Sequence, residues 1–139
     1  MVGVVVATHG KLAEELIRTA ERVCGEIPGC RAVSIESAPG MEDARTQLAD
    51  AIREVDTGDG VLVLTDMFGG TPANLALTFL EDRVDVVTGV NLPMLVKLST
   101  CRAEGTGLRD TAQLLAGYGQ KNITLASELL RTRAKATRS

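Results

Sequence analysis

Valine-rich apolar runs that alternate with segments of helical period constrain the fold of this chain more than any other feature. Residues 1–7 (MVGVVVA) are continuously apolar, the pattern of a strand buried on both faces of a parallel sheet. The predicted strands cover residues 1–7, 30–36, 61–66 and 84–89. The predicted helices between them cover residues 11–25, 41–55 and 69–82. This alternation predicts an α/β fold, a doubly wound domain whose mainly parallel central sheet is flanked by helices.

The remaining third of the chain continues the pattern less regularly. Residues 90–100 and 108–120 have helical spacing, with Pro93 interrupting the first segment. Residues 121–127 (KNITLAS) predict a short late strand, and the GYGQ stretch before it could serve as a hinge. We therefore expect one domain over 1–126, followed by a basic polar tail over 127–139 that is a frayed end or a linker remnant.

Composition excludes several classes of function. A net charge of −3 and only three aromatic residues argue against nucleic acid as a partner and against binding to an anionic membrane surface. No apolar run approaches the roughly 20 residues of a membrane span, and the opening lacks the features of a signal peptide. The three cysteines form no CxxC pair, so we expect reduced thiols and a cytoplasmic protein. The lone His9 lies in another segment than the cysteines, so we expect no metal site.

Three loops follow predicted strands at the edge where ligands bind in such folds: THGK after the first, TDMFGGTPAN after the third and TGVNLPM after the fourth. His9 follows the first strand, and Asp66 ends the third. A carboxylate that binds one imidazole nitrogen fixes the tautomer and leaves the other nitrogen free as a nucleophile. His9 and Asp66 are therefore candidate catalytic residues, although a lone histidine that only binds a loop carbonyl is the competing interpretation.

The loop after the third predicted strand, TDMFGGTPAN, has the composition of an anion-binding site. Gly69 and Gly70 permit close backbone approach, Thr71 can cap a helix, and Pro72 suits a first helical position. Such a helix start attracts a phosphoryl group, but the same residues also suit an ordinary turn between a strand and a helix. Walker, dinucleotide-binding and serine-hydrolase motifs are absent, so we expect no nucleotide cofactor.

Taken together, these loops resemble the signature segments of the mannose-family IIA component of the bacterial phosphoenolpyruvate-dependent sugar phosphotransferase system (PTS). The resemblance covers residues 2–126 and combines His-Gly after the first strand, Asp-x-Phe-Gly-Gly-Thr-Pro after the third and Gly-Val-Asn-Leu-Pro after the fourth. It implies a phosphotransferase that needs no cofactor. It also implies that the sheet of four parallel strands gains a late antiparallel edge strand, for which residues 121–127 are the candidate.

The resemblance also implies roles for individual residues. His9 would accept a phosphoryl group from the histidine-containing phosphocarrier protein (HPr) and pass it to a cysteine or histidine of a IIB component. Asp66 would orient His9, and Gly69, Gly70 and Thr71 would cradle the phosphoryl group. The active-site rim would comprise Thr8, Gly10, Phe68, Asn91 and Pro93.

The sequence leaves the physiological role open. Many relatives continue into a IIB domain, whereas this sequence stops, so we expect that its IIB component is a separate protein or absent. We expect contact with the membrane only through IIC and IID components. A regulatory protein that reports phosphoenolpyruvate supply is the first alternative. The phosphoryl-donor domain of dihydroxyacetone kinase is a second, although that group tends to have His-Ser after the first strand. A binding module that keeps the fold without catalysis is the third.

We also expect a homodimer. A parallel sheet of four strands leaves an edge with unpaired backbone groups, which proteins usually cover. Residues 121–127 are short and compatible with a strand, so they could pair with the sheet of a second subunit. The resemblance implies the same arrangement, since relatives often exchange this strand between subunits.

Overall fold

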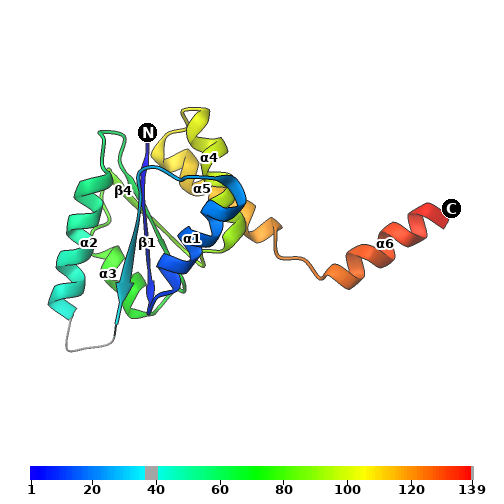
Figure 1. Cartoon of the computed structure of the whole chain (residues 1–139), viewed down its shortest axis with the longest axis horizontal. Helices are drawn as coiled ribbons and strands as arrows, with labels where there is room; N and C mark the ends of the chain where they lie inside the picture. The colour runs from blue at the N-terminus through cyan, green and yellow to red at the C-terminus, as the bar shows by residue number, and fades with distance from the viewer. Residues whose placement is uncertain (37–40, 139) are drawn as a thin grey trace.

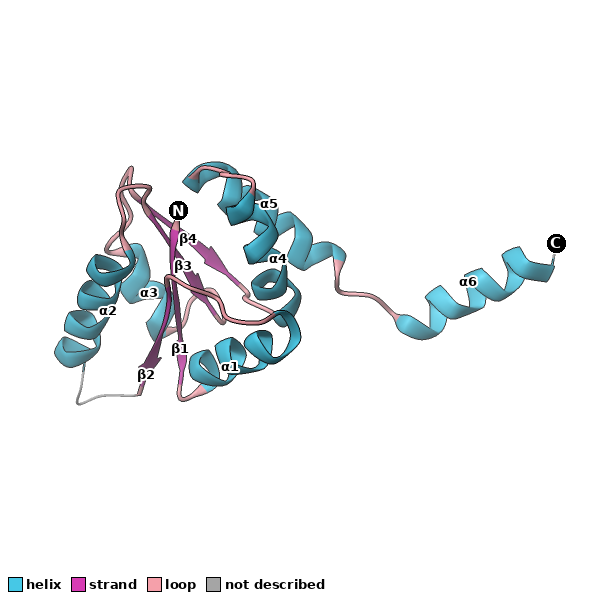
Figure 2. Cartoon of the chain, turned by 45° about the horizontal axis from the view of Figure 1, so that its top comes forward, coloured by secondary structure: helices cyan, strands magenta, loops and turns pink. Residues whose placement is uncertain are grey.

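The computed structural model describes residues 1–36 and 41–138, with only the backbone described for 41–42 and 136–138. Its elements are β1 (Gly3–His9), α1 (Leu12–Cys24), β2 (Cys30–Ile35), α2 (Met41–Val55), β3 (Val61–Thr65), α3 (Thr71–Leu77), β4 (Val84–Thr88), α4 (Leu92–Ala103), α5 (Leu108–Lys121) and α6 (Ala126–Arg138). Helices cover both sides of the sheet, and α6 projects away from the body (Figures 1 and 2). The predicted α/β class is confirmed.

The sheet has four parallel strands in the order β2-β1-β3-β4. In the sheet, β2 lies on one side of β1, and β3 and then β4 lie on the other side. The order of the strands therefore reverses between β1 and β3, and ligands of doubly wound folds bind where such a reversal occurs. Ala7 of β1 lies opposite Thr65 of β3, so the residues that follow each strand emerge side by side.

Apolar side chains of the central strands pack against helices on both faces, as the continuous valine runs predict. On one face, Val4, Val6 and Leu64 pack in a core with residues of α1, α4 and α5. On the other, Val5 and Val63 pack in a core with residues of α2 and α3. Burial on both faces explains why β1 and β3 have no alternation of apolar and polar residues.

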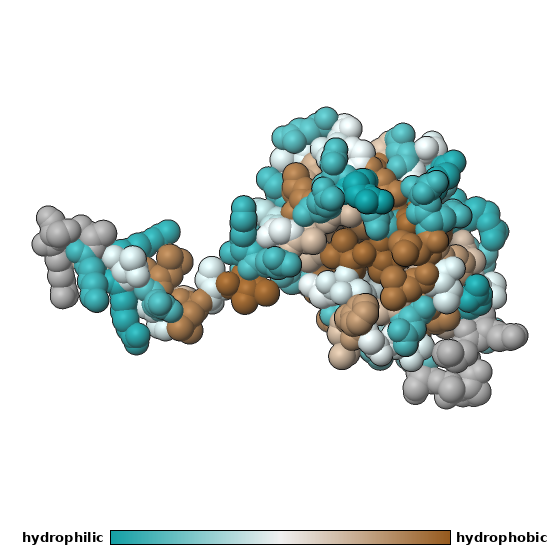
Figure 3. Space-filling model, turned by 180° about the vertical axis from the view of Figure 1, so that it is seen from behind, coloured by the Kyte–Doolittle hydropathy of each residue, from teal (hydrophilic) through white to brown (hydrophobic). Residues whose placement is uncertain are grey.

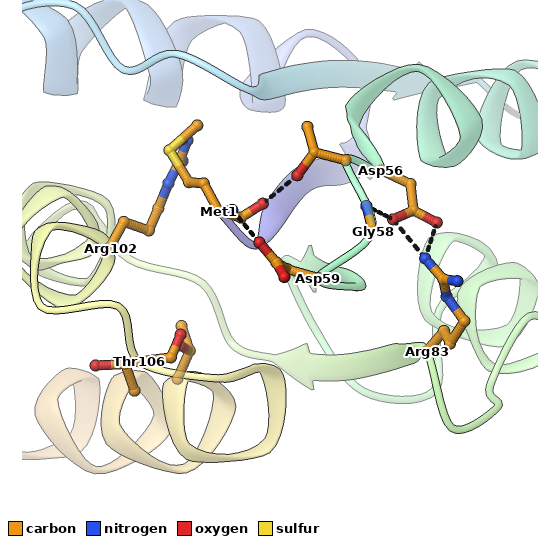
Figure 4. A network of polar contacts seen from close by, with 9 residues as sticks. Met1, Asp56, Gly58, Asp59, Arg83, Arg102 and Thr106 are labelled. Carbon is orange, nitrogen blue, oxygen red and sulfur yellow. Dashed lines mark hydrogen bonds and ion pairs between the residues drawn. The ribbon is translucent and has the colours of Figure 1, made fainter.

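A polar network ties together the opposite, amino-terminal edge of the sheet (Figure 4). Arg83, just before β4, donates to both carboxylate oxygens of Asp56 at 2.9 and 2.8 Å, and the N–H of Gly58 donates to Asp56 at 2.9 Å. The amino group of Met1 pairs with Asp59. These contacts fix the start of β3 against its neighbours, at the end of the sheet away from His9.

The predicted late strand is wrong. Helix α5 continues to Lys121, residues 122–125 are irregular, and α6 begins at Ala126. A strand needs a neighbouring backbone, whereas Ile123 and Leu125 are 76% and 66% exposed in this segment. The carbonyl of Leu125 instead accepts the N–H groups of Glu128 and Leu129, both at 3.1 Å, as a helix begins.

Two further predictions about the C-terminal region need correction. The proposed GYGQ hinge lies inside α5, where Gly119 is buried. The tail over 127–139 is not frayed, because α6 is a helix up to Arg138, while residue 139 lies outside the described residues. The described part of the chain contains no helix that is both long and apolar enough to cross a membrane.

Smaller differences concern helix starts. Pro93 does not interrupt α4 but stands in its first turn, after the Asn91 cap, where proline is tolerated. Helix α3 is shorter than predicted, since it ends at Leu77. Its N-cap is Gly70 rather than Thr71, which is already helical.

Candidate active site

His9 and Asp66 meet at the carboxyl edge of the sheet. His9 is the last residue of β1, and Asp66 follows β3, the adjacent strand. The imidazole Nδ1 lies 2.8 Å from Asp66 Oδ2, and the main-chain N–H of His9 donates to the same oxygen at 3.2 Å. Asp66 Oδ1 accepts the N–H of Met67 at 3.1 Å, so both carboxylate oxygens are held.

This arrangement fixes the tautomer of the imidazole. Burial raises the pKa of the Asp66 carboxyl, but the hydrogen bonds from His9 and its charge lower it more, so the net pKa lies below its usual value. An ionised carboxylate can only accept hydrogen bonds, so Nδ1 carries the proton and donates. The other ring nitrogen, Nε2, therefore keeps its lone pair. The His9 side chain is half exposed, which lets a reaction partner approach.

Gly70 lies directly against the reactive side of the ring. A Cβ atom at residue 70 would lie 3.1 Å from His9 Nε2 and 2.6 Å from Cε1, and the second distance is closer than such atoms approach in proteins. The backbone of Gly70 has φ −86°, which any residue can adopt. The requirement for glycine here is therefore one of space beside the imidazole.

Gly69 and Thr71 flank Gly70 in this loop. Gly69 has φ +88°, a conformation that favours glycine, and it allows the turn that brings Gly70 to the ring. Thr71 opens α3 and lines a hollow of about 300 Å³ together with Arg45, Asn74, Leu75 and Thr78. Of the three residues predicted to cradle a phosphoryl group, Gly70 therefore lies beside Nε2.

Two residues next to His9 shape the backbone. Thr8 is fully buried, and its hydroxyl accepts the N–H of Ala13 at 2.7 Å, which anchors the first turn of α1 below the site. Gly10 has φ +53°, and its N–H donates to Ile35 of β2 at 3.1 Å. Together they turn the chain sharply from β1 into α1 and leave His9 at the turn.

Asn91 and Pro93 are placed in the α4 helix start. Asn91 Oδ1 accepts the N–H of Met94 at 3.2 Å, and its Nδ2 donates to the carbonyl of Gly119 in α5 at 3.1 Å. Asn91 thereby caps one helix and ties it to the next. The loop before it is held to β3, since Thr65 accepts the N–H groups of Gly89 and Val90, both at 2.9 Å.

Three apolar residues near His9 are exposed, and sequence reasoning gave two of them no place in the site. Phe68 was predicted at the rim and is 75% exposed. Met67 is 55% exposed, and Leu12 is 46% exposed. The signal for Met67 was its position, an apolar residue inside a loop of turn-forming residues. Leu12 is the first residue of α1, whereas its neighbour Ala13 is fully buried in the core.

The described residues contain no group of three or more His, Cys, Asp or Glu side chains that could hold a metal ion. Cys30 is half-buried, and loss of solvation raises the pKa of its thiol to about 12, which keeps it protonated. The chemistry available at the site therefore belongs to the His9 imidazole, its carboxylate partner and the adjoining glycine loop.

The chain matches the family model described as "PTS system fructose IIA component" over residues 3–116. The fructose-specific EIIA component of Bacillus subtilis is 30% identical over 132 residues, which cover 94% of this chain and 90% of that protein. The mannose-specific EIIAB component of Escherichia coli is also 30% identical, over 88% of this chain, but the matched part is only 38% of that longer protein.

Solved structures agree with these matches. The mannose/sorbose-specific IIA subunit from Enterococcus faecalis superposes with a TM-score of 0.78 at 28% identity, covering 88% of this chain and 92% of that one. A PTS IIA protein of Streptococcus pneumoniae, associated with a fucose utilization operon, gives 0.77 at 28% identity over 94% and 99% of the two chains. With the family model matching most of its length, the chain belongs to the mannose/fructose IIA family of the PTS.

Proposed function

We propose that this protein carries phosphoryl groups on His9, accepting them from the histidine-containing phosphocarrier protein and passing them to a IIB component during carbohydrate uptake. Membership of the IIA family supports a phosphoryl-carrier role in a sugar PTS. The observation that carries the proposal is the pairing of His9 with Asp66, which leaves one ring nitrogen free. The proposal places the protein in the cytoplasm, in contact with the membrane only through IIC and IID components.

The transfer is a displacement at phosphorus. The lone pair of His9 Nε2 forms the new N–P bond as the bond between phosphorus and the imidazole of the donor breaks, and that imidazole leaves with the bonding pair. The ring of phosphorylated His9 keeps the Nδ1 proton, and the resulting positive charge is stabilised by the Asp66 carboxylate. In the second step, a cysteine or histidine of IIB attacks the same phosphorus, and His9 leaves as neutral imidazole. The reaction needs neither metal nor cofactor.

Gly69, Gly70 and Thr71 are proposed to hold the phosphoryl oxygens. Gly70 lies against Nε2 with no side chain in the way, and Thr71 contributes a hydroxyl and a main-chain N–H. Phe68 and Gly10 complete the rim above the site. The buried Thr8, together with Asn91 and Pro93 at the start of α4, supports the rim from below and from the side.

The experiment that tests the proposal is phosphorylation of the purified chain by labelled phosphoenolpyruvate, enzyme I and the phosphocarrier. One phosphoryl group per chain is expected, lost in acid and stable in base, as for a phosphoramidate. The His9→Gln variant should remain unlabelled. Label that stays on His9→Gln, or a wild-type chain that accepts none, would refute the assignment.

A regulatory role is the second candidate. A segment of the Bacillus subtilis transcriptional regulatory protein LevR is 30% identical to this chain over 100 residues, which are 71% of this chain and 10% of that protein. The same domain therefore also occurs in a protein named as a regulator. Transfer from phosphorylated His9 to a purified IIB protein separates the two roles, since a purely regulatory protein would not complete that step at a useful rate.

We also propose that the protein is a homodimer. Seen from behind, the body carries an apolar patch (Figure 3). In the edge strand β4, Val86 and Val87 are half-buried, and Leu80 before this strand is exposed. The segment that projects from the body carries Ile123, Leu125, Leu129 and Leu130, all exposed. An isolated helix of the length of α6 is marginal in water, so it needs a partner.

Charge complements these apolar surfaces. Glu81, Asp82 and Asp85 lie near the exposed edge of β4, along a hollow that Leu80 and Leu108 also line. In α6, basic residues predominate after Leu130. We propose that this segment of each subunit covers the β4 side of the other, as a helix and irregular chain or after rearrangement into a strand.

A further inference from the structure

The outer edge of β2 is open to a further strand. β2 is the outermost strand on its side of the sheet, and among the described residues β1 is the strand that pairs with it. The carbonyls of Gly29, just before β2, and of Ile35, its last residue, accept N–H groups from the β1 side at 2.9 and 3.1 Å. Because successive residues of a strand direct their backbone groups to opposite sides, the residues of even number face outward. These outward-facing residues are Cys30, Ala32 and Ser34.

A hollow of about 330 Å³ lies along this edge. It is lined by residues 31–34 of β2, by Glu14 of α1 and by residues of α2 that include Asp50, Ala51 and Glu54. The two helices pack on opposite faces of the sheet, and β2 runs between them (Figure 1). The backbone edge of β2 therefore lies in a slot that has a helix on each side.

Acidic side chains predominate in this slot. Three carboxylates line it, those of Glu14, Asp50 and Glu54, together with one guanidinium, that of Arg31. Arg31 pairs with Glu54, whereas Glu14 accepts a hydrogen bond from a neutral hydroxyl group at 3.2 Å. A negative charge remains even when Arg53, which pairs with Asp50 at 3.4 Å, is counted as well. A second copy of this edge would bring like charges together, which disfavours pairing of the chain with itself here.

We infer that the outer edge of β2 docks an extended, basic segment of another protein, which joins the sheet as a further strand. Hydrogen bonds to the outward backbone groups of Ala32 and its neighbours would hold the segment, the mode in which exposed sheet edges bind peptides. Its lysine or arginine side chains would face Glu14 and Asp50. This edge lies on the opposite side of the sheet from β4, so it is separate from the surface proposed for the dimer. Ala32 is also nearer the start of β2, whereas His9 lies beside its end.

The test is titration of the full chain with a labelled synthetic peptide of about five Lys-Val repeats, followed by fluorescence anisotropy. A second peptide of the same sequence carries N-methyl groups throughout, which keep its charges and remove its backbone N–H donors. The first peptide should bind, and the second should bind roughly tenfold more weakly or worse, because strand addition needs those donors. Absence of binding up to millimolar peptide, or equal binding of the two peptides, would refute strand addition.

Variants of the chain test where the peptide binds. Ala32→Pro should weaken binding roughly tenfold or more, because proline removes an outward N–H, and an edge strand tolerates proline where that N–H faces solvent. Glu14→Gln combined with Asp50→Asn should weaken it roughly three- to tenfold, the scale of two exposed ion pairs. Glu81→Gln combined with Asp82→Asn, at the hollow beside β4, is the matched control, since it changes the charge equally and should leave binding unchanged.

Hydrogen exchange provides a readout that needs no variant. In the wild-type chain, the peptide should slow exchange of the outward amide hydrogens of Ala32 and Ser34. Melting temperatures check that each variant keeps the fold. Unchanged exchange, equal losses in the two charge variants, or a folded Ala32→Pro chain that binds like the wild type would each overturn the inference. The proposed phosphoryl transfer would stand in every case, because the peptide assay does not involve His9.

Discussion

Asp66 binds both the side chain and the main chain of His9: its Oδ2 lies 2.8 Å from His9 Nδ1 and 3.2 Å from the main-chain nitrogen of His9. The ring and the backbone from which it extends are thus fixed by a single oxygen. Preorganisation of this kind removes rotational freedom that the imidazole would otherwise lose in the transfer. It also aligns Nε2 with the space beside Gly70.

Replacing Asp66 by asparagine should slow phosphoryl transfer by roughly 10²- to 10⁴-fold, the upper figure being the loss for the orienting aspartate of serine proteases. The amide can present its NH₂ group to Nδ1 and so stabilise the wrong tautomer, and it provides no charge to balance a phosphorylated imidazolium. Stopped-flow transfer from the phosphocarrier measures the rate, and circular dichroism checks the fold. A rate within twofold of the wild type would reduce Asp66 to a structural role.

Gly70→Ala should keep the fold and lose transfer. The added methyl group would lie 2.6 Å from His9 Cε1, so the half-exposed ring must turn away from it and weaken its bond to Asp66. We expect the transfer rate to fall roughly 10- to 100-fold, which corresponds to an increase of about 1.4 to 2.7 kcal/mol in the activation free energy. Gly107→Ala is the control, because Gly107 also has an ordinary φ and open space around it. Equal transfer rates in the two variants would contradict the steric role.

Removal of residues 123–139 should convert the proposed dimer into a monomer. The cut leaves α5 intact, which ends at Lys121, and removes Ile123, Leu125, Leu129 and Leu130 together. A chain ending after Leu130 keeps these four residues and should remain dimeric. Because it lacks the basic residues after Leu130, salt should weaken its dimer less than the dimer of the full-length chain. Light scattering on the three chains gives the mass. A monomeric full-length protein, or a dimer that survives the longer deletion, would exclude this interface.

The Asp56 network should make stability depend on pH in acid. The hydrogen bond from the N–H of Gly58 and the pairing with Arg83 lower the pKa of Asp56, despite an opposing effect of burial. A carboxyl with a lowered pKa stabilises the fold above its unfolded pKa of about 3.9, and this contribution disappears as pH falls through the lower folded value.

Asp56→Asn should therefore destabilise the protein by about 0.5–1 kcal/mol at pH 7, the scale of partly exposed ion pairs, and by progressively less below pH 4. Urea unfolding at pH 7, 4 and 3 provides the comparison. Phosphorylation of His9 should be unaffected, because Asp56 lies at the opposite edge of the sheet. A difference between variant and wild type that stays constant from pH 7 to pH 3 would rule out the ionised carboxylate as its source.

The sequence by itself determined the class of fold and the loops that form the site. Valine runs such as residues 1–7 can only be buried on both faces, and the helical period of 41–55 predicts α2 with its observed bounds. Glycine and proline in FGGTP force a turn after β3, whatever the rest of the chain does. These are local consequences of burial and backbone geometry, so they can be derived from neighbouring residues alone.

Tertiary structure decided the rest, because it depends on which backbone lies beside which. His9 and Asp66 are 57 residues apart and meet only because β3 pairs with β1. Residues 122–125 are compatible with a strand, but no strand of the described residues lies beside them, so they stay irregular before α6. Leu12 has the apolar spacing of α1 but is exposed at the first residue of the helix. Periodicity reports a face of an element, whereas only packing shows what covers that face.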